Sequence, residues 1–186
     1  MAKKQKCVFG QQRVEYLGHV ISNKGVTGDS SKVSSVMQWP FPKNVKGVPG
    51  SLGLTGYYHK FIANYGKISK PLTDLTKKDG FGWNEVAAAA FEQLKLAVTS
   101  APVLALPNFD IPYEIECDWV GVVLMQSKHP IAYFSKTFSN SKLSKPAYDK
   151  KLFALVLDIQ HWRHYLLGRK FVVYSDQKSL RHLVQQ

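Results

Sequence analysis

The last third of the chain opens on a strict alternation of apolar and polar residues. In YEIECDWVGVVLMQ (113–126), Tyr113, Ile115 and Cys117 fall on one side and three acidic residues on the other. A period of two predicts a half-buried strand. The apolar run 120–125 follows at once and can pair back on that strand as a β-hairpin.

The rest of this third predicts two more strands and a long helix. One strand is expected over 129–138 and another over 171–175. Between them, from Pro146 to Gly168, apolar residues recur every three or four positions, which is the spacing of an amphipathic helix. Residues 179–184 begin a further helix. The pattern therefore predicts a mixed sheet with helices.

The start of the chain predicts a small β piece followed by a helix. Residues 6–26 consist of short extended segments broken by glycines, with a turn at 23–25. So small a β piece has little core and must pack on another part of the chain. The pattern then becomes helical, and Asp29 or Ser30 can cap a helix that ends at Trp39-Pro40.

Three further helices are expected before the last third. Asn44 could cap the first of them, but Pro49 and several glycines favour a start near Ser51. Pro71 suits the first position of the next helix. Asn84 can cap a long helix that stops before residue 102. The sequence as a whole indicates an α+β chain.

Composition narrows the class of protein. The 186 residues allow one or two small domains, and 45% hydrophobic content is normal for a globular protein. Two cysteines, Cys7 and Cys117, are too few for a disulfide framework or a zinc site. No apolar run approaches the roughly 20 residues of a membrane helix, and no secretory signal is present. We expect an intracellular protein without a membrane partner.

Positive charge is concentrated in the first part of the chain. Residues 1–80 carry 13 Lys/Arg against 4 Asp/Glu, which gives +9 of the total net charge of +12. Such an excess indicates a polyanionic partner, because each neutralised phosphate releases a condensed counterion. A merely basic soluble protein would show the same charge, so charge alone leaves both interpretations open.

Two aspartates follow separate predicted strands. Asp118 and Asp176 are separated by the long helix, and strands joined in this way can lie adjacent and parallel with their ends together. Clustered carboxylates of this kind hold the metal ions of two-metal phosphodiester chemistry. Each could equally be an ordinary solvent-facing residue.

Several segments, in the same order along nearly the whole chain, carry a family resemblance. They are VEYLGHVIS (14–22), WPFPKNVK (39–46), LGLTGYYHKFIANYGKISKPLTDL (52–75), PVLALPNF (102–109), HPIAYFSK (129–136) and HWRHYLLGRKFVVYSDQKSL (161–180). Together they resemble the part of a gypsy-type LTR-retrotransposon polyprotein that runs from the end of the reverse transcriptase into RNase H.

The resemblance implies four parts. They are an end-of-palm hairpin resembling the primer grip (1–27), a thumb-like helical segment (28–80), a connecting helix and linker (81–110), and a truncated RNase H-like α/β domain (111–186). A thumb tracks a template–primer duplex, which implies a non-specific nucleic-acid partner and no small-molecule substrate. The candidate binding residues in the thumb-like segment are Lys43, Lys46, Tyr57, His59, Lys60 and Lys67. Tyr57, Tyr58 and Phe61 could stack on bases or could belong to the core.

The resemblance also implies a Mg²⁺ site, but this sequence differs from the family at several of the site's positions. Asp118 and Asp176 match the first and third metal-binding carboxylates, but the second falls at Lys151. On a helix, Asp149 would point elsewhere and Asp158 would lie about 10 Å further along, so neither would substitute. The segment of the fourth carboxylate and the Tyr-x-Asp-Asp polymerase motif are absent from the sequence.

These departures lead to the functional expectation. The chain resembles a fragment of an RNA-directed DNA polymerase and RNA–DNA hybrid ribonuclease that is catalytically inactive and retains at most nucleic-acid binding. One alternative is a translated transposon relic without a selected function. Another is a weakly active Mg²⁺-dependent RNase H. In the thumb-like segment, Pro49 and Ser51 stand where the family prefers an arginine and a phenylalanine, which weakens phosphate contact and core.

Overall fold

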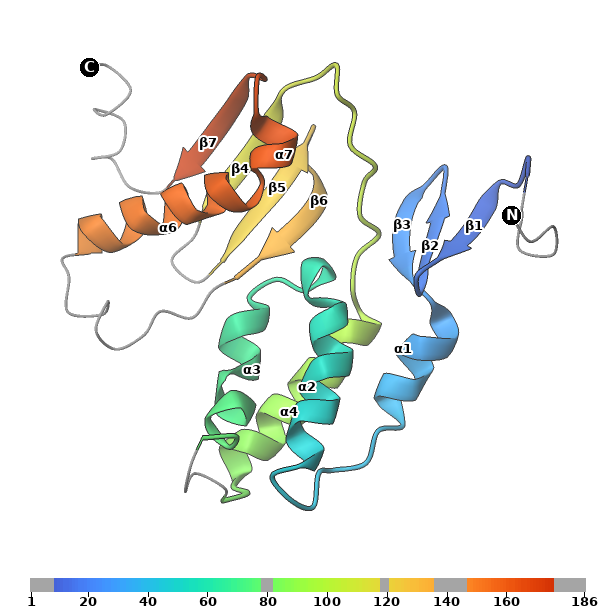
Figure 1. The fold of residues 1–186 in the computed structure, drawn as a ribbon, viewed down its shortest axis with the longest axis vertical. Coiled ribbons are helices and arrows are strands. Elements are labelled where there is room, and N and C mark those ends of the chain that lie inside the picture. Colours follow the sequence, from blue (N-terminus) through green and yellow to red (C-terminus); the bar gives the residue numbers. More distant parts are fainter. Residues whose placement is uncertain (1–8, 78–81, 118–120, 136–146, 176–186) are drawn as a thin grey trace, which may run out of the picture.

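The computed structural model describes residues 9–77, 82–117, 121–135 and 147–175. A small sheet and a helical bundle are followed by a second sheet that a helix crosses (Figure 1). The first part contains β1 (Arg13–Tyr16), β2 (His19–Ser22), β3 (Gly25–Gly28), α1 (Ser30–Met37), α2 (Gly47–Tyr57), the short 3₁₀ helix η2 (His59–Phe61), α3 (Tyr65–Asp74) and α4 (Glu85–Thr99). The second part contains β4 (Tyr113–Cys117), β5 (Val122–Gln126), β6 (His129–Phe134), α6 (Ala147–His161), α7 (Arg163–Leu166) and β7 (Phe171–Ser175). The predicted α+β class is confirmed.

The predicted β piece at the start of the chain is an antiparallel sheet of three strands. Its order is β1-β2-β3, and Gly25 follows the β2–β3 turn with a φ of 124°. All four residues of β1 are exposed, whereas Val20 of β2 is buried. The Asp29 cap is confirmed, since its carboxylate accepts a hydrogen bond of 2.9 Å from the backbone N–H of Ser31.

Helix α2 begins earlier than the sequence suggests. Its first residue is Gly47, not one near Ser51, so that expectation was wrong. Pro49 is the third residue of the helix, where a backbone N–H would have no intrahelical acceptor, and its missing donor therefore costs little. The side chain of Asn44 accepts a hydrogen bond of 3.0 Å from the Gly47 N–H and supports the first turn.

Helix α3 also differs from the expectation. Pro71 lies inside it and not at its first position, because the helix starts at Tyr65. Asn64 adopts a left-handed conformation, and its carbonyl accepts hydrogen bonds from Lys67 and Ile68 that begin the helix. Pro71 removes one later backbone hydrogen bond. Burial of the neighbouring Leu72, which is fully enclosed, offsets this loss.

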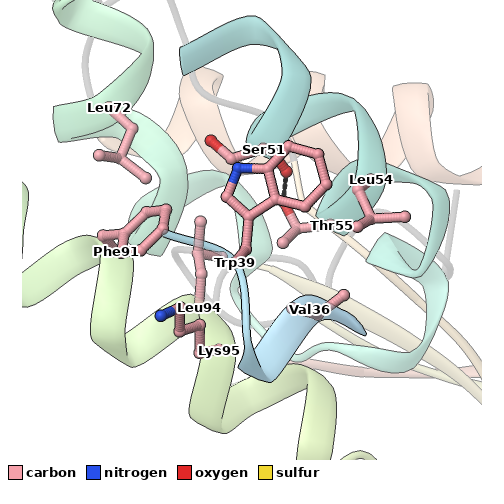
Figure 2. Close-up of a pocket in the computed structure, with 9 residues that line it drawn as sticks. All are labelled: Val36, Trp39, Ser51, Leu54, Thr55, Leu72, Phe91, Leu94 and Lys95. Carbon is pink, nitrogen blue, oxygen red and sulfur yellow. Dashed lines mark hydrogen bonds between the residues drawn. The ribbon is translucent and has the colours of Figure 1, made fainter. Parts of the chain in front are cut away.

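One core joins α2, α3 and α4. Asn84 caps α4 as predicted, accepting a hydrogen bond of 2.9 Å from the Ala87 N–H. The buried residues of this core are Val48, Leu72, Leu75, Ala87, Ala90, Phe91 and Leu94. A cavity of about 10 Å³ lies beside it, next to Ser51 and Trp39 (Figure 2). That volume is about the room of one water molecule.

The second sheet has the order β6-β5-β4-β7. The predicted β4–β5 hairpin is confirmed, with Cys117 opposite Val122. β7 lies parallel to β4, as expected for strands joined by a helical crossover, and Ser175 pairs with Cys117 at their ends. The part of the expected third strand at 136–138 and the partial helix at 179–184 lie outside the described residues.

The long helix predicted before Gly168 is two helices. α6 ends at His161, and α7 follows after Trp162. Trp162 is buried against the sheet, and its φ and ψ of −97° and 18° turn the chain between the helices. The Gly168 stop is confirmed, with a φ of 73°. No helix in the described ranges is long and apolar enough to cross a membrane.

The linker after α4 connects both sheets (Figure 1). Leu104 exchanges two backbone hydrogen bonds with Val26 of β3, at 2.8 and 2.9 Å. The next residue, Ala105, donates to the Pro130 carbonyl of β6 at 2.7 Å. A further hydrogen bond of 2.6 Å runs from the Gly66 N–H to the Ser135 hydroxyl. The helical bundle and the second sheet are therefore held together at several points.

Candidate nucleic-acid interface

The sequence predicts a metal site at the ends of β4 and β7. Because Cys117 pairs with Ser175, the two strands end side by side. The residues that follow them in sequence, Asp118 and Asp176, lie outside the described residues. Lys151 falls within α6, but its side chain also lies outside the described part. The metal roles assigned to these residues therefore stay predictions.

Two described side chains lie near these strand ends. Asp158 of α6 is only 7% exposed, and burial raises the pKa of its carboxyl to about 7. Burial, then the charges of Asp158 and Glu116, raises the pKa of the Cys117 thiol to about 12. Metal ligands must be deprotonated, so these two groups fit Mg²⁺ poorly. Across the described ranges, no three His, Cys, Asp or Glu side chains gather around a possible metal position.

The predicted nucleic-acid-binding residues lie at two ends of α2. Lys43 and Lys46 are exposed in the loop before it, while His59 and Lys60 belong to η2 just after it. Helix α2 has 11 residues and is therefore about 16 Å long. These side chains are therefore separated by the length of α2 and do not form a single cluster.

The aromatic residues of this segment divide between surface and core. Tyr58 and Phe61 are 1% exposed, so they belong to the core. Tyr57 is 45% exposed, and its ring stacks on the ring of His19 with centres 5.1 Å apart and planes 9° apart. Its hydroxyl donates a hydrogen bond to the Leu17 carbonyl. Tyr57 is therefore the aromatic side chain of the three that nucleic acid can reach.

Lys43, Lys46, Lys60 and Lys67 have no ion pair with another described residue. In the described part, the lysines with ion pairs are Lys70 and Lys77, which share Asp74, and Lys95, which pairs with Glu92. Lys60 is half-buried, and this burial lowers the pKa of its ammonium, which lies 5.3 Å from the centre of the Phe61 ring. Lys67 is exposed on α3.

Sequence reasoning missed two residues at this interface. They are His19 and Lys32: burial lowers the pKa of His19, and the charges of Lys60 and Lys32 lower it further. His19 stands between Gly18 and Val20 in VEYLGHVIS, and nothing in that segment indicates that Lys32 of α1 and Lys60 of η2 lie close to it. Only the packing of the β-hairpin on the helices brings them together.

Comparison with known proteins finds a matching domain family for the second part of the chain and relatives of nearly the whole chain. Residues 83–173 match the RNase H-like domain found in reverse transcriptase. The chain is 38% identical over 184 residues to the retrovirus-related Pol polyprotein from transposon 297 of Drosophila melanogaster, which covers 96% of this chain. The chain belongs to the retrovirus-related Pol polyprotein family. The predicted retrotransposon origin is confirmed, while the gypsy subtype stays a prediction.

Two further proteins are similar to the chain in sequence. The Transposon Tf2-3 polyprotein of Schizosaccharomyces pombe is 34% identical over 187 residues. The uncharacterized mitochondrial protein AtMg00860 of Arabidopsis thaliana is 52% identical over 114 residues, which are 60% of this chain and 72% of that protein. The chain spans 17% of the Drosophila polyprotein and 14% of the Tf2-3 polyprotein.

A solved structure shows the same fold. The foamy viral protease–reverse transcriptase in complex with double-stranded DNA matches with a TM-score of 0.83 at 22% identity. The match covers 95% of this chain and 33% of that chain. The fold of this Pol-family chain is therefore that of part of a reverse transcriptase.

Proposed function

We propose that the helical half of this Pol-family chain binds nucleic acid through its phosphates, without sequence preference. The observation that carries the proposal is the set of lysines at both ends of α2 and on α3 that form no ion pair within the described part of the chain. Residues 1–80 also hold +9 of the net charge of +12. Foamy viral protease–reverse transcriptase, which has this fold, was solved with double-stranded DNA and with an RNA/DNA hybrid, and this supports the proposal.

The dimensions of α2 suit a nucleic-acid backbone. Phosphates along one strand are separated by about 3.4 Å of helix axis. A helix of about 16 Å therefore lets Lys46 at one end and Lys60 at the other reach phosphates about five nucleotides apart. The exposed ring of Tyr57 is at the same end of α2 as Lys60, three residues before it, and can contact a sugar or base there.

We further propose that the chain does not cleave RNA–DNA hybrids. RNase H-like domains typically act with divalent metal ions held by carboxylates. Lys151 stands at the position of the second such carboxylate in the resembled family, and an ammonium repels a divalent cation. Burial raises the pKa of the Asp158 carboxyl and of the Cys117 thiol, which disfavours the charged forms that bind a metal ion. Mg²⁺ would then bind weakly through Asp118 and Asp176, if both face one point.

A cleavage assay tests the catalytic half of the proposal. Purified chain is incubated with a labelled RNA–DNA hybrid in Mg²⁺ and, separately, in Mn²⁺. No cleavage above a protein-free control is expected. Cleavage that disappears in Asp118→Asn would contradict the proposal and would assign an active RNase H site to this chain.

A salt titration tests the binding half. We expect the affinity for a hybrid or DNA duplex to fall steeply between about 50 mM and about 300 mM salt. Lys46→Gln should weaken binding at all sequences equally and reduce the slope of log affinity against log salt by about 1. Fluorescence anisotropy with a labelled duplex measures both quantities.

The matched control for this experiment is Lys70→Gln. Lys70 is already paired with Asp74 at 2.9 Å, so its removal should change the salt slope much less than Lys46→Gln does. Binding that is absent, or that does not respond to salt, would contradict the proposal whatever the variants do.

The four-part division of the chain also remains a proposal. The RNase H-like match begins at residue 83, whereas α4 shares its core with α3 of the thumb-like segment. We therefore propose that 81–110 is a connecting region that packs on the thumb-like segment (28–80) and leads into the RNase H-like part (111–186). Residues 1–27 would then be the hairpin part, whose described residues carry β1, β2 and the start of β3.

A further inference from the structure

His19 occupies a cage of aromatic rings between the first sheet and the helices. It lies on β2, and its ring centre is 5.1 Å from that of Tyr57, 5.8 Å from that of Tyr58 and 5.5 Å from that of Phe61. Its Nδ1 atom is buried and has no hydrogen-bond partner among the described residues. A neutral imidazole can leave Nδ1 as a bare acceptor, whereas an imidazolium would place an unsatisfied N–H there.

The charges around the cage are positive. Lys32 of α1 and Lys60 of η2 both act on His19 and, together with burial, lower its pKa below the ordinary value of 6.5. The carboxylate of Asp29, at the start of α1, already accepts hydrogen bonds from the backbone N–H and hydroxyl of Ser31. The remaining titratable groups that face the ring are the phenols of Tyr57 and Tyr58.

The β1–β2 hairpin is attached through the pairing of β2 with β3, through the buried Val20 and through the contacts of its turn. Every residue of β1 is exposed, so this strand adds nothing to the core. The turn of the hairpin is held by the Tyr57 hydroxyl on the Leu17 carbonyl and by the Tyr58 hydroxyl on the Gly18 carbonyl, the second at 3.0 Å. Both tyrosines also pack on His19, so the imidazole and the two hydroxyl contacts form one attachment.

We propose that neutral His19 is a clasp that holds the β1–β2 hairpin on the corner between α2 and η2, and that protonation of His19 releases the hairpin. An imidazolium in this cage would face two ammonium groups and would lack an acceptor for its new N–H. The attraction between a cation and aromatic rings opposes this, but it is shared with a Lys60 already lying over Phe61.

The direction of the pH effect follows from the lowered pKa. The unfolded hairpin binds a proton at a higher pH than the attached hairpin does. The attachment is therefore fully present above the ordinary histidine pKa of 6.5 and is lost as the pH falls from there through the lowered pKa of His19. The clasp does not depend on whether the chain binds nucleic acid.

Hydrogen exchange tests the clasp on the full chain. Amide protection is measured by NMR at about pH 7.5 and about pH 5, with intrinsic exchange rates corrected. The Val20 and Ile21 amides should lose protection about fivefold or more at the lower pH, while the Phe91 and Leu94 amides of α4 keep theirs. In His19→Phe, which keeps a ring but cannot be protonated, hairpin protection should no longer depend on pH.

Two further variants keep the proposal falsifiable. Lys60→Gln removes one nearby charge and should move the pKa of His19, measured by NMR, upward toward 6.5. His129→Gln alters an exposed histidine of β6 and should leave the pH dependence of hairpin protection as in the wild type. Hairpin protection that ignores pH in the wild type would overturn the proposal. So would a pH effect that survives in His19→Phe, or a simultaneous loss of protection in α4.

Discussion

Asp158→Asn is expected to raise the free energy of unfolding by about 2–4 kcal/mol at about pH 8. The aspartate is 7% exposed on the side of α6 that packs toward the sheet, and burial raises its pKa from 3.8 to about 7. Holding this carboxylate in its charged form therefore costs the folded state free energy. An amide of the same shape removes that cost. Urea unfolding at two pH values measures the difference.

The pH dependence of this effect separates it from a packing effect. Because the pKa of Asp158 is raised on folding, its stabilising protonated form is fully present below 3.8 and is lost as the pH rises through about 7. The gain from Asp158→Asn should thus be large at about pH 8 and close to zero at about pH 4. The control is Asp110→Asn, at an exposed carboxylate, which should change little at either pH. An equal gain at both pH values would contradict burial as the cause.

Gly25→Ala is expected to lower the free energy of unfolding by about 3 kcal/mol or more. Gly25 has a φ of 124°, which an alanine adopts only with strain. A Cβ placed there would also lie 2.2 Å from the backbone carbonyl oxygen of Leu104. Because that oxygen accepts the hydrogen bond from Val26, the linker would have to move away from β3. Chemical denaturation measures the loss of stability.

Gly53→Ala is the matched control for this prediction. Gly53 lies inside α2, and a Cβ there would have nothing within 4 Å. Alanine should therefore raise the free energy of unfolding by up to about 1 kcal/mol, through its higher helix propensity. If Gly25→Ala were as harmless as Gly53→Ala, the pairing of the linker with β3 would be wrong.

Gly25 lies beside the backbone pairing that joins the two sheets. The pairing of Leu104 with Val26 on one side, and of Ala105 with β6 on the other, ties the first sheet to the second. A change at Gly25 should therefore disturb both parts together. Elements distant in sequence meet at Asp158, Gly25, His19 and Leu104, and each of these positions is buried or closely packed.

Local sequence rules succeeded where the decisive contacts are local. The caps Asp29 and Asn84, the β4–β5 hairpin and the Gly168 stop depend on residues within a few positions of one another. The rules failed at the two prolines. Pro49 stands in the first turn of α2, where a missing backbone donor costs little, whereas at Pro71 the burial of apolar side chains in the shared core outweighs a local preference of the backbone.

The candidate interface shows the same division. The lysines and the excess of positive charge follow from the sequence, because charge and composition need no folded structure, whereas the sequence left open whether Tyr57 lies at the surface or in the core. The aromatic cage around His19 was not predicted. Its members come from β2, α2 and η2, and their meeting depends on how the small sheet packs on the helical corner.

The sequence by itself determined the family of this chain, most of its strands and helices, and the basic character of its first half. These are properties of residue identity and short-range spacing. The tertiary structure alone decided which charges of the described residues are exposed or paired, that Asp158 is buried, and that the Nδ1 atom of His19 has no hydrogen-bond partner among the described residues. The physical reason is that desolvation and pairing depend on side chains far apart in sequence, whose distances only the folded core fixes.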